Sequence, residues 1–195
     1  CFENDDVVHV AGRIDPIHDI EVINTELLLA DLAGVEKAAE KSEKAAKAGN
    51  VQATTAMALV YLNGSLGAVN YETGSSLLRQ AADAGDAEAQ FNMGLLSTGA
   101  FGNPPDYTLA ADWFRRAADQ KHAAAGYQLG LLYLDGRGVE KNLVTAGKLV
   151  GEAAQAGDVD AMLDYGVLVM RGEGVKQDIK IGSQWLLLSA RRGNV

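Results

Sequence analysis

The chain has 195 residues, 48% of them hydrophobic, and a formal net charge of −9. This composition supports a folded core, but it argues against nonspecific binding to nucleic acid or an anionic membrane, which both require a surplus of Lys and Arg. The single cysteine, Cys1, excludes an internal disulfide, and no stretch approaches the roughly 18 apolar residues of a transmembrane helix.

Residues 1–44 carry most of the negative charge, with 11 acidic and 4 basic residues against 15 and 13 in residues 45–195. Asp15-Pro16 marks a break, after which apolar residues recur at helical spacing. These residues are Ile20, Ile23, Leu27, Leu28, Leu32 and Val35. We therefore expect a mostly helical N-terminal segment that ends in a charged, alanine-rich helix.

From Ala45 onward the sequence repeats every 36 residues, whereas residues 1–44 show no such register. The repeats start at Ala45, Ala81, Ala117 and Ala153, and a stub starts at Ser189. A fixed period of about 20–50 residues predicts a solenoid, because one unit cannot bury its apolar face alone. The N-terminal segment could then cap the first repeat. Such a stack presents a surface to partners and rarely houses a reaction.

Each repeat predicts two antiparallel helices joined by a glycine-rich loop. The first helix is expected to begin after Asn50, Asp86, His122 or Asp158 and to end near Tyr61, Thr98, Leu134 or Met170. The second is expected to begin at Asn70, Asp106, Asn142 or Asp178. Asn and Asp are good N-caps because their side-chain oxygen accepts a free amide of the first turn. His122 departs from this pattern, so we expect a less regular helix start there and an exposed His122.

Small and large residues also recur in register. The first helices carry Ala58, Gly94, Gly130 and Gly166 at one position. Because Gly inside a helix costs about 1 kcal/mol relative to Ala, the recurrence predicts close approach of a neighbouring helix. The second helices carry Leu77, Trp113, Leu149 and Trp185 at one position. This shared position favours core packing of the tryptophans over a role as exposed anchors for a partner.

The sequences AEAQFNMGLLSTGAFGNPPDYTLAADWFRRAAD, from Ala87 to Asp119, and AAGYQLGLLYLDGRGVEKN, from Ala124 to Asn142, resemble the Sel-one-like repeat (SLR) family, a relative of the tetratricopeptide repeat. The resemblance covers residues 45–195, and the first repeat is the most degenerate. It implies an all-α fold: a right-handed α-α solenoid of about four 36-residue helix-turn-helix repeats whose first helices line the concave face. It also implies an adaptor or scaffold without catalysis.

The sequence CFENDDVVHVAGRIDPIHDIEVINTELLLADL, from Cys1 to Leu32, is similar to the Obg-like, YchF-type family of P-loop nucleotide hydrolases. This divides the chain into a YchF-like segment, 1–44, and an SLR solenoid, 45–195. The alternative function is therefore a truncated or fused, ribosome-associated ATP or GTP hydrolase. It would be inactive here, because the 195 residues contain no G-x-x-x-x-G-K-[ST] loop to hold the phosphates. The junction, Lys44–Asn50, suits a natural fusion, a fragment or an artificial joint equally well.

Other motifs carry weaker chemical signals. The glycine pairs of residues 136–138 and 172–174 follow helices, which favours interhelical turns over nucleotide loops. His9 and His18 have acidic neighbours but no ligand spacing that favours a metal. A lipidated Cys1 is a further alternative. We therefore predict no catalytic, cofactor-binding or metal-binding residues, and no cofactor.

The first helices supply the candidate binding surface, because residues four apart share a helix face. The predicted partner-binding residues are Glu88, Asn92, Gln128, Asp160 and Asp164. This polar, partly acidic stripe favours a protein or peptide partner that carries Lys or Arg, although a merely solvated face is the alternative. We predict a non-catalytic interaction scaffold. A genuine YchF-like segment would indicate the cytoplasm, the repeats allow the periplasm or envelope, and the sequence indicates no oligomeric state.

Overall fold

The computed structural model describes residues 34, 37–65, 67–99 and 104–193, and all regular secondary structure within these residues is helical. The first helices of the repeats are α2 (Val51–Asn63), α4 (Ala87–Ser97), α6 (Ala123–Asp135) and α8 (Val159–Arg171). The second helices are α3 (Tyr71–Asp83), α5 (Tyr107–Asp119), α7 (Leu143–Gln155) and α9 (Ile179–Arg191). Residues 37–47 form a further helix before α2. The all-α solenoid expected from the sequence is confirmed.

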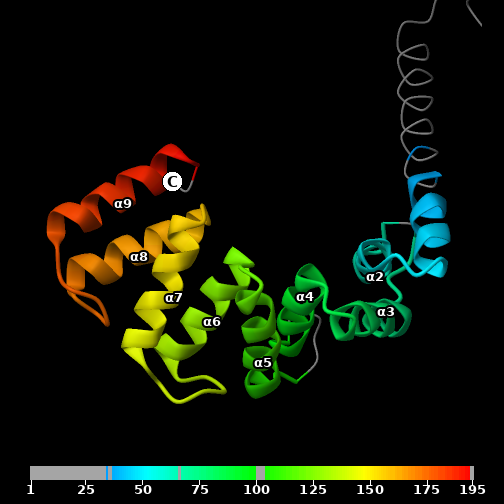
Figure 1. Cartoon of the computed structure of the whole chain (residues 1–195), viewed down its shortest axis with the longest axis horizontal. Helices are drawn as coiled ribbons and strands as arrows, with labels where there is room; N and C mark the ends of the chain where they lie inside the picture. The colour runs from blue at the N-terminus through cyan, green and yellow to red at the C-terminus, as the bar shows by residue number, and fades with distance from the viewer. Residues whose placement is uncertain (1–33, 35–36, 66, 100–103, 194–195) are drawn as a thin grey trace, which may run out of the picture.

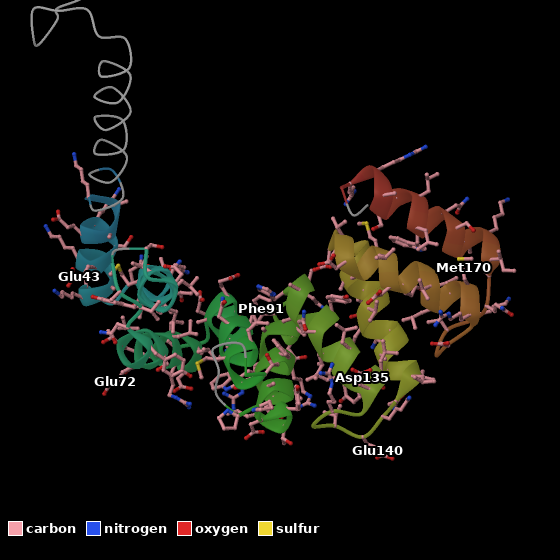
Figure 2. The ribbon with its side chains drawn as sticks, turned by 180° about the vertical axis from the view of Figure 1, so that it is seen from behind. Glu43, Glu72, Phe91, Asp135, Glu140 and Met170 are labelled. Carbon is pink, nitrogen blue, oxygen red and sulfur yellow. The ribbon has the colours of Figure 1, made fainter. Side chains whose placement is uncertain are left out.

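The helix pairs follow one another along an arc from α2 to α9 (Figure 1). Within the first two pairs, α2 and α4 lie on the inner side of this arc and α3 and α5 on its outer side. In Figure 2, Phe91 of α4 lies toward the inner side, whereas Glu140, in the loop between α6 and α7, lies at the outer edge.

The helices begin where the capping residues predict. The side chains of Asn50, Asp86 and Asp158 each accept the backbone amide three residues on, at 2.8 Å. The expectation of a less regular start at His122 is wrong, because its Nδ1 accepts the amide of Ala125 at 3.2 Å and α6 begins in register. The departure is confined to the preceding residue, Lys121, which holds a φ of 67° where the other repeats have glycine.

The recurring helical glycines mark close helix contacts, as predicted. A Cβ on Gly130 would lie 2.7 Å from Val150 Cγ2, and one on Gly166 would lie 2.9 Å from Leu186 Cδ2. Both distances are shorter than side-chain packing allows, so a larger residue would push α6 from α7 or α8 from α9. Gly94 is packed in the same way against Phe114.

The tryptophans pack inward rather than projecting as anchors. Trp113 is 4% exposed and belongs to a core cluster with Ala82 and Met93. Trp185 is half-buried and meets Tyr165 edge to face, with ring centroids 5.5 Å apart. The prediction of core packing is thus confirmed for Trp113, and Trp185 packs against the core cluster of the last repeat.

The helix at 37–47 takes the place of a second helix before α2. The turn after it closes with a hydrogen bond from the amide of Asn50 to the carbonyl of Ala45, at 3.0 Å. The later repeats close with the equivalent bonds Asp86 to Ala81, His122 to Ala117 and Asp158 to Ala153, at 3.1–3.2 Å. The expectation that residues 1–44 lie outside the register is therefore wrong for residues 37–44.

Candidate functional site

The five predicted partner-binding residues lie on three successive first helices. Glu88 and Asn92 belong to α4, Gln128 to α6, and Asp160 and Asp164 to α8. Asp160 and Glu88 are exposed, and the other three are half-buried. We call the surface that these five residues mark the first-helix face.

Glu88 and Asn92 are tied to the next repeat through a histidine. The Glu88 carboxylate accepts a hydrogen bond from Asn92 Nδ2 at 2.9 Å and lies 3.1 Å from His122 Nε2. The His122 ring stacks on Phe91, with centroids 4.7 Å apart. Since Nδ1 accepts the Ala125 amide, neutral His122 carries its proton on Nε2 and donates it to Glu88. His122 was expected at the surface, and its side chain is half-buried there, at 19% exposure.

Asp164 is tied to the preceding repeat through a tyrosine. The Tyr127 hydroxyl donates to Asp164 Oδ2 at 2.8 Å. Burial raises the pKa of Tyr127, and the hydrogen bond to Asp164 and the charges of Asp164, Asp160 and Asp158 raise it further. The phenol therefore stays protonated in a region of negative potential, where a cation would be favoured.

Sequence reasoning missed the two aromatic residues of this surface, Phe91 and Tyr127. A signal was present, because they stand 36 residues apart and so share one repeat position. Together with His122 they connect the predicted polar residues across neighbouring helices. The first-helix face can therefore offer the carboxylates of Glu88 and Asp164, which are held in place by contacts between repeats.

The described residues offer no group of three or more His, Cys, Asp and Glu side chains that could hold a metal ion. His9, His18 and Cys1 lie outside these residues. Among the described helices, none is both long and apolar enough to cross a bilayer. The glycine-rich loops are interhelical turns, as predicted: Gly138 has a φ of 70° and packs against the backbone of Tyr107.

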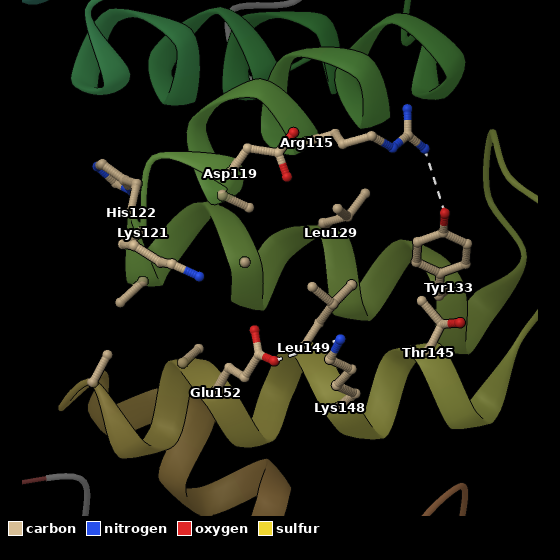
Figure 3. Close-up of a pocket in the computed structure, with 15 residues that line it drawn as sticks. Arg115, Asp119, Lys121, His122, Leu129, Tyr133, Thr145, Lys148, Leu149 and Glu152 are labelled. Atoms are coloured by element: carbon tan, nitrogen blue, oxygen red, sulfur yellow. Dashed lines mark hydrogen bonds and ion pairs between the residues drawn. The ribbon is translucent and has the colours of Figure 1, made fainter.

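A groove of about 430 Å³ lies between α5 and α7, and α6 forms its floor (Figure 3). Leu129 and Leu149 both line it, and Arg115 reaches over to the Tyr133 hydroxyl at 3.4 Å. Leu129 lies about 100° around α6 from Gln128, so it projects from a different side of the helix. The sequence analysis did not find this groove.

Comparison with known proteins identifies the repeats. A family model described as the Sel1 repeat matches residues 51–86, 87–122, 123–158 and 159–194. The solved structure of a Sel1 repeat protein from Oxalobacter formigenes is 32% identical, with a TM-score of 0.75, over 81% of this chain and 64% of that one. A protective antigen of uropathogenic Escherichia coli strains, which displays an SLR fold, is 28% identical, with a TM-score of 0.67, over 80% of this chain and 37% of that one.

A shorter part of the chain is similar to a different family. The ribosome-binding ATPase YchF of Haemophilus influenzae is 60% identical over 53 residues, which are 27% of this chain and 15% of the ATPase. The ribosome-binding ATPase YchF of Escherichia coli O157:H7 is 50% identical over 60 residues, or 31% and 16%. The chain thus spans less than a fifth of the length of these relatives, and the YchF-like fragment inferred from the sequence is confirmed as a local similarity.

Proposed function

Because this chain belongs to the Sel1 repeat family, we propose that it is a non-catalytic scaffold that binds a partner protein or peptide on its first-helix face. The proposal rests on one arrangement: three successive first helices present polar side chains in register, and two of those side chains are held by contacts between repeats. Such fixed side chains lose little conformational freedom when a partner binds.

The charge of the first-helix face supports a partner segment that carries Lys or Arg. Glu88, Asp160 and Asp164 contribute three carboxylates. The Glu88 side chain is 55% exposed, and the acidic groups around Tyr127 already favour its protonated form. Opposite charge speeds association and selects among partners more than it adds affinity. We therefore expect the interaction to weaken as salt is added.

The nucleotide hydrolase is the second candidate, and the similarity to YchF over 53 residues is the observation that favours it. That similarity spans 15% of the ATPase, and the 195 residues contain no phosphate-binding loop sequence. We therefore assign no nucleotide chemistry to these residues.

A displayed library of random peptides, selected against the full chain, tests the scaffold proposal. We expect the selected peptides to be rich in Lys and Arg. They should lose binding to a variant with Glu88→Gln, Asp160→Asn and Asp164→Asn. The matched control removes the same charge elsewhere, with Asp83→Asn, Asp135→Asn and Glu140→Gln, and should keep binding. Equal binding to both variants would show that the first-helix face is not the site.

A further inference from the structure

Two positions of the groove between α5 and α7 carry smaller side chains than their equivalents in the neighbouring repeats. Gly126 on α6 has no side chain, and its nearest possible Cβ contact is Ala118 Cβ at 4.0 Å. Leu149 on α7 lies opposite, half-buried at the edge of a core cluster. Gly126 therefore lacks the steric reason that explains Gly130, although a helical glycine costs about 1 kcal/mol relative to alanine. Its effect is to leave space.

The neighbouring repeats carry larger side chains at the positions equivalent to Gly126 and Leu149. In the next repeat, Met162 and Trp185 stand 36 residues after Gly126 and Leu149. In the preceding repeat, Gln90 and Trp113 stand 36 residues before them. The preceding repeat keeps a groove of about 520 Å³ lined by Arg79, Met93 and Ser97, the counterparts of Arg115, Leu129 and Tyr133, but Gln90 and Trp113 do not line it. Trp113 clusters with Ala82 and Met93, the counterparts of the groove residues Ala118 and Leu129.

The first repeat supplies an independent comparison, because it carries Leu77 at the position of Leu149. There, too, the structure is hollow: a cavity of about 320 Å³ is lined by Thr54, Met57 and Leu77. These residues are the counterparts of Gly126, Leu129 and Leu149, two repeats earlier. Leu77 and Leu149 thus each line a hollow at the edge of a core cluster, whereas Trp113 is buried within one.

We propose that the groove between α5 and α7 is a binding pocket for an aromatic side chain, above all tryptophan, of a partner protein. The chain itself shows that this environment accepts an indole, because Trp113 and Trp185 occupy its equivalents. Leu129 on the α6 floor and Leu149 on the α7 wall supply apolar contacts. The rim supplies Arg115, whose guanidinium can stack on an aromatic face. On α5 itself, Arg116 lies over the Trp113 ring at 4.5 Å from its centroid, and Glu152 stands at the position equivalent to Arg116 in the groove.

The pocket is lined by the second helices α5 and α7 as well as by α6, and it borders the first-helix face at His122, which contacts Glu88. It is a second contact surface that goes beyond the proposed function. The two surfaces can be tested separately. Charge removal on the first-helix face leaves the groove residues unchanged, and filling the groove leaves the carboxylates unchanged.

The test uses N-acetyl-L-tryptophanamide as a probe, titrated into the ¹⁵N-labelled full chain and followed by NMR. We expect saturable shifts at the amides of Gly126, Leu129 and Leu149, and weaker binding of N-acetyl-L-leucinamide. Leu149→Trp fills the pocket as in the neighbouring repeats and should weaken probe binding by roughly tenfold or more, as for the loss of an aromatic anchor. Val144→Trp adds the same ring to α7 at a 70% exposed position and should leave binding unchanged.

Three results would overturn the proposal: no saturable shifts up to the solubility limit of the probe, shifts that lie elsewhere, or shifts that persist in Leu149→Trp. Folding of the variants is itself a readout. Leu149→Trp and Gly126→Met place residues of the last repeat in a groove proposed to have room for them, so both should melt no lower than the wild type. A variant that unfolds would show that the room is absent.

Discussion

At the scale of single residues, one residue type serves two purposes within α6. Gly130 lets α7 approach, because a Cβ there would lie 2.7 Å from Val150. Gly126, one turn earlier, has nothing closer than 4.0 Å and leaves a groove. The sequence predicts the first role, because Gly130 recurs in register with Gly94 and Gly166. The sequence does not predict the second role, because the space beside Gly126 depends on the side chains that face it from α5 and α7.

Gly130→Leu should lower the free energy of unfolding by about 1–3 kcal/mol, since overpacking forces neighbouring side chains out of position. Two controls separate this effect from a general sensitivity of the region. Lys148→Ala, at a side chain that is 74% exposed, should change it by less than about 0.5 kcal/mol. Gly126→Ala should be neutral or stabilising. Urea unfolding measures all three, and equal midpoints for the Gly130 and Lys148 variants would refute the close-packing argument.

His122 carries a second residue-scale prediction. His122→Ala removes the cap of α6, worth about 1 kcal/mol, and the stacking contact with Phe91, worth about 0.5–1.5 kcal/mol. It should therefore lower the melting temperature. His122→Asn restores the kind of cap found at Asn50 and should recover part of the loss. Thermal unfolding by circular dichroism distinguishes the two, and equal losses would mean that the cap contributes nothing.

At the scale of helices, the boundaries could be predicted within one or two residues, because capping side chains and glycine loops are local signals. The helix at 37–47 was harder to place. Its backbone follows the 36-residue register, but its sequence does not show it, because the helix is rich in Lys and Glu. Glu43 and Lys47, for example, form an ion pair at 2.7 Å. The groove was missed for a related reason: it depends on the volumes of side chains on three helices, which only their packing brings together.

The helix at 37–47 should stabilise the first repeat, because neighbouring units stabilise one another in a solenoid. Its Ala39 is buried at 8% exposure. A chain that begins at Ala45 should fold but melt at a lower temperature than the full chain, as followed by circular dichroism. A chain that begins at Gly34 keeps the helix and should retain more of the stability. If both shortened chains melt alike, the helix contributes nothing to the repeats.

At the scale of the whole molecule, the 36-residue period predicts the architecture, because each repeat contacts only its neighbours. The period does not predict which side chains of neighbouring repeats contact one another on the binding surface. The ties between Glu88 and His122 and between Tyr127 and Asp164 join residues more than 30 positions apart. These contacts could not be predicted from the sequence, because they depend on how the first helices lie side by side.

The full chain should bind neither ATP nor GTP, since its sequence offers no loop to hold the phosphates. Calorimetric titration with either nucleotide and magnesium should give no heat beyond dilution. Micromolar binding would contradict this prediction and would revive the hydrolase suggested by the similarity to YchF.

Because the turns between repeats share one geometry, the chain could gain or lose whole repeats during evolution. The bond from Asn50 to Ala45 recurs at Asp86, His122 and Asp158 with nearly the same distance. Removing residues 87–122 would therefore join Asp86 to Ala123 across a turn of the same geometry. Loss or duplication of whole 36-residue units by recombination would preserve every remaining joint. A deletion of 35 residues whose ends fall within helices would rotate the helix that follows by about 100° relative to its neighbours, so loss of whole repeats disturbs the packing least.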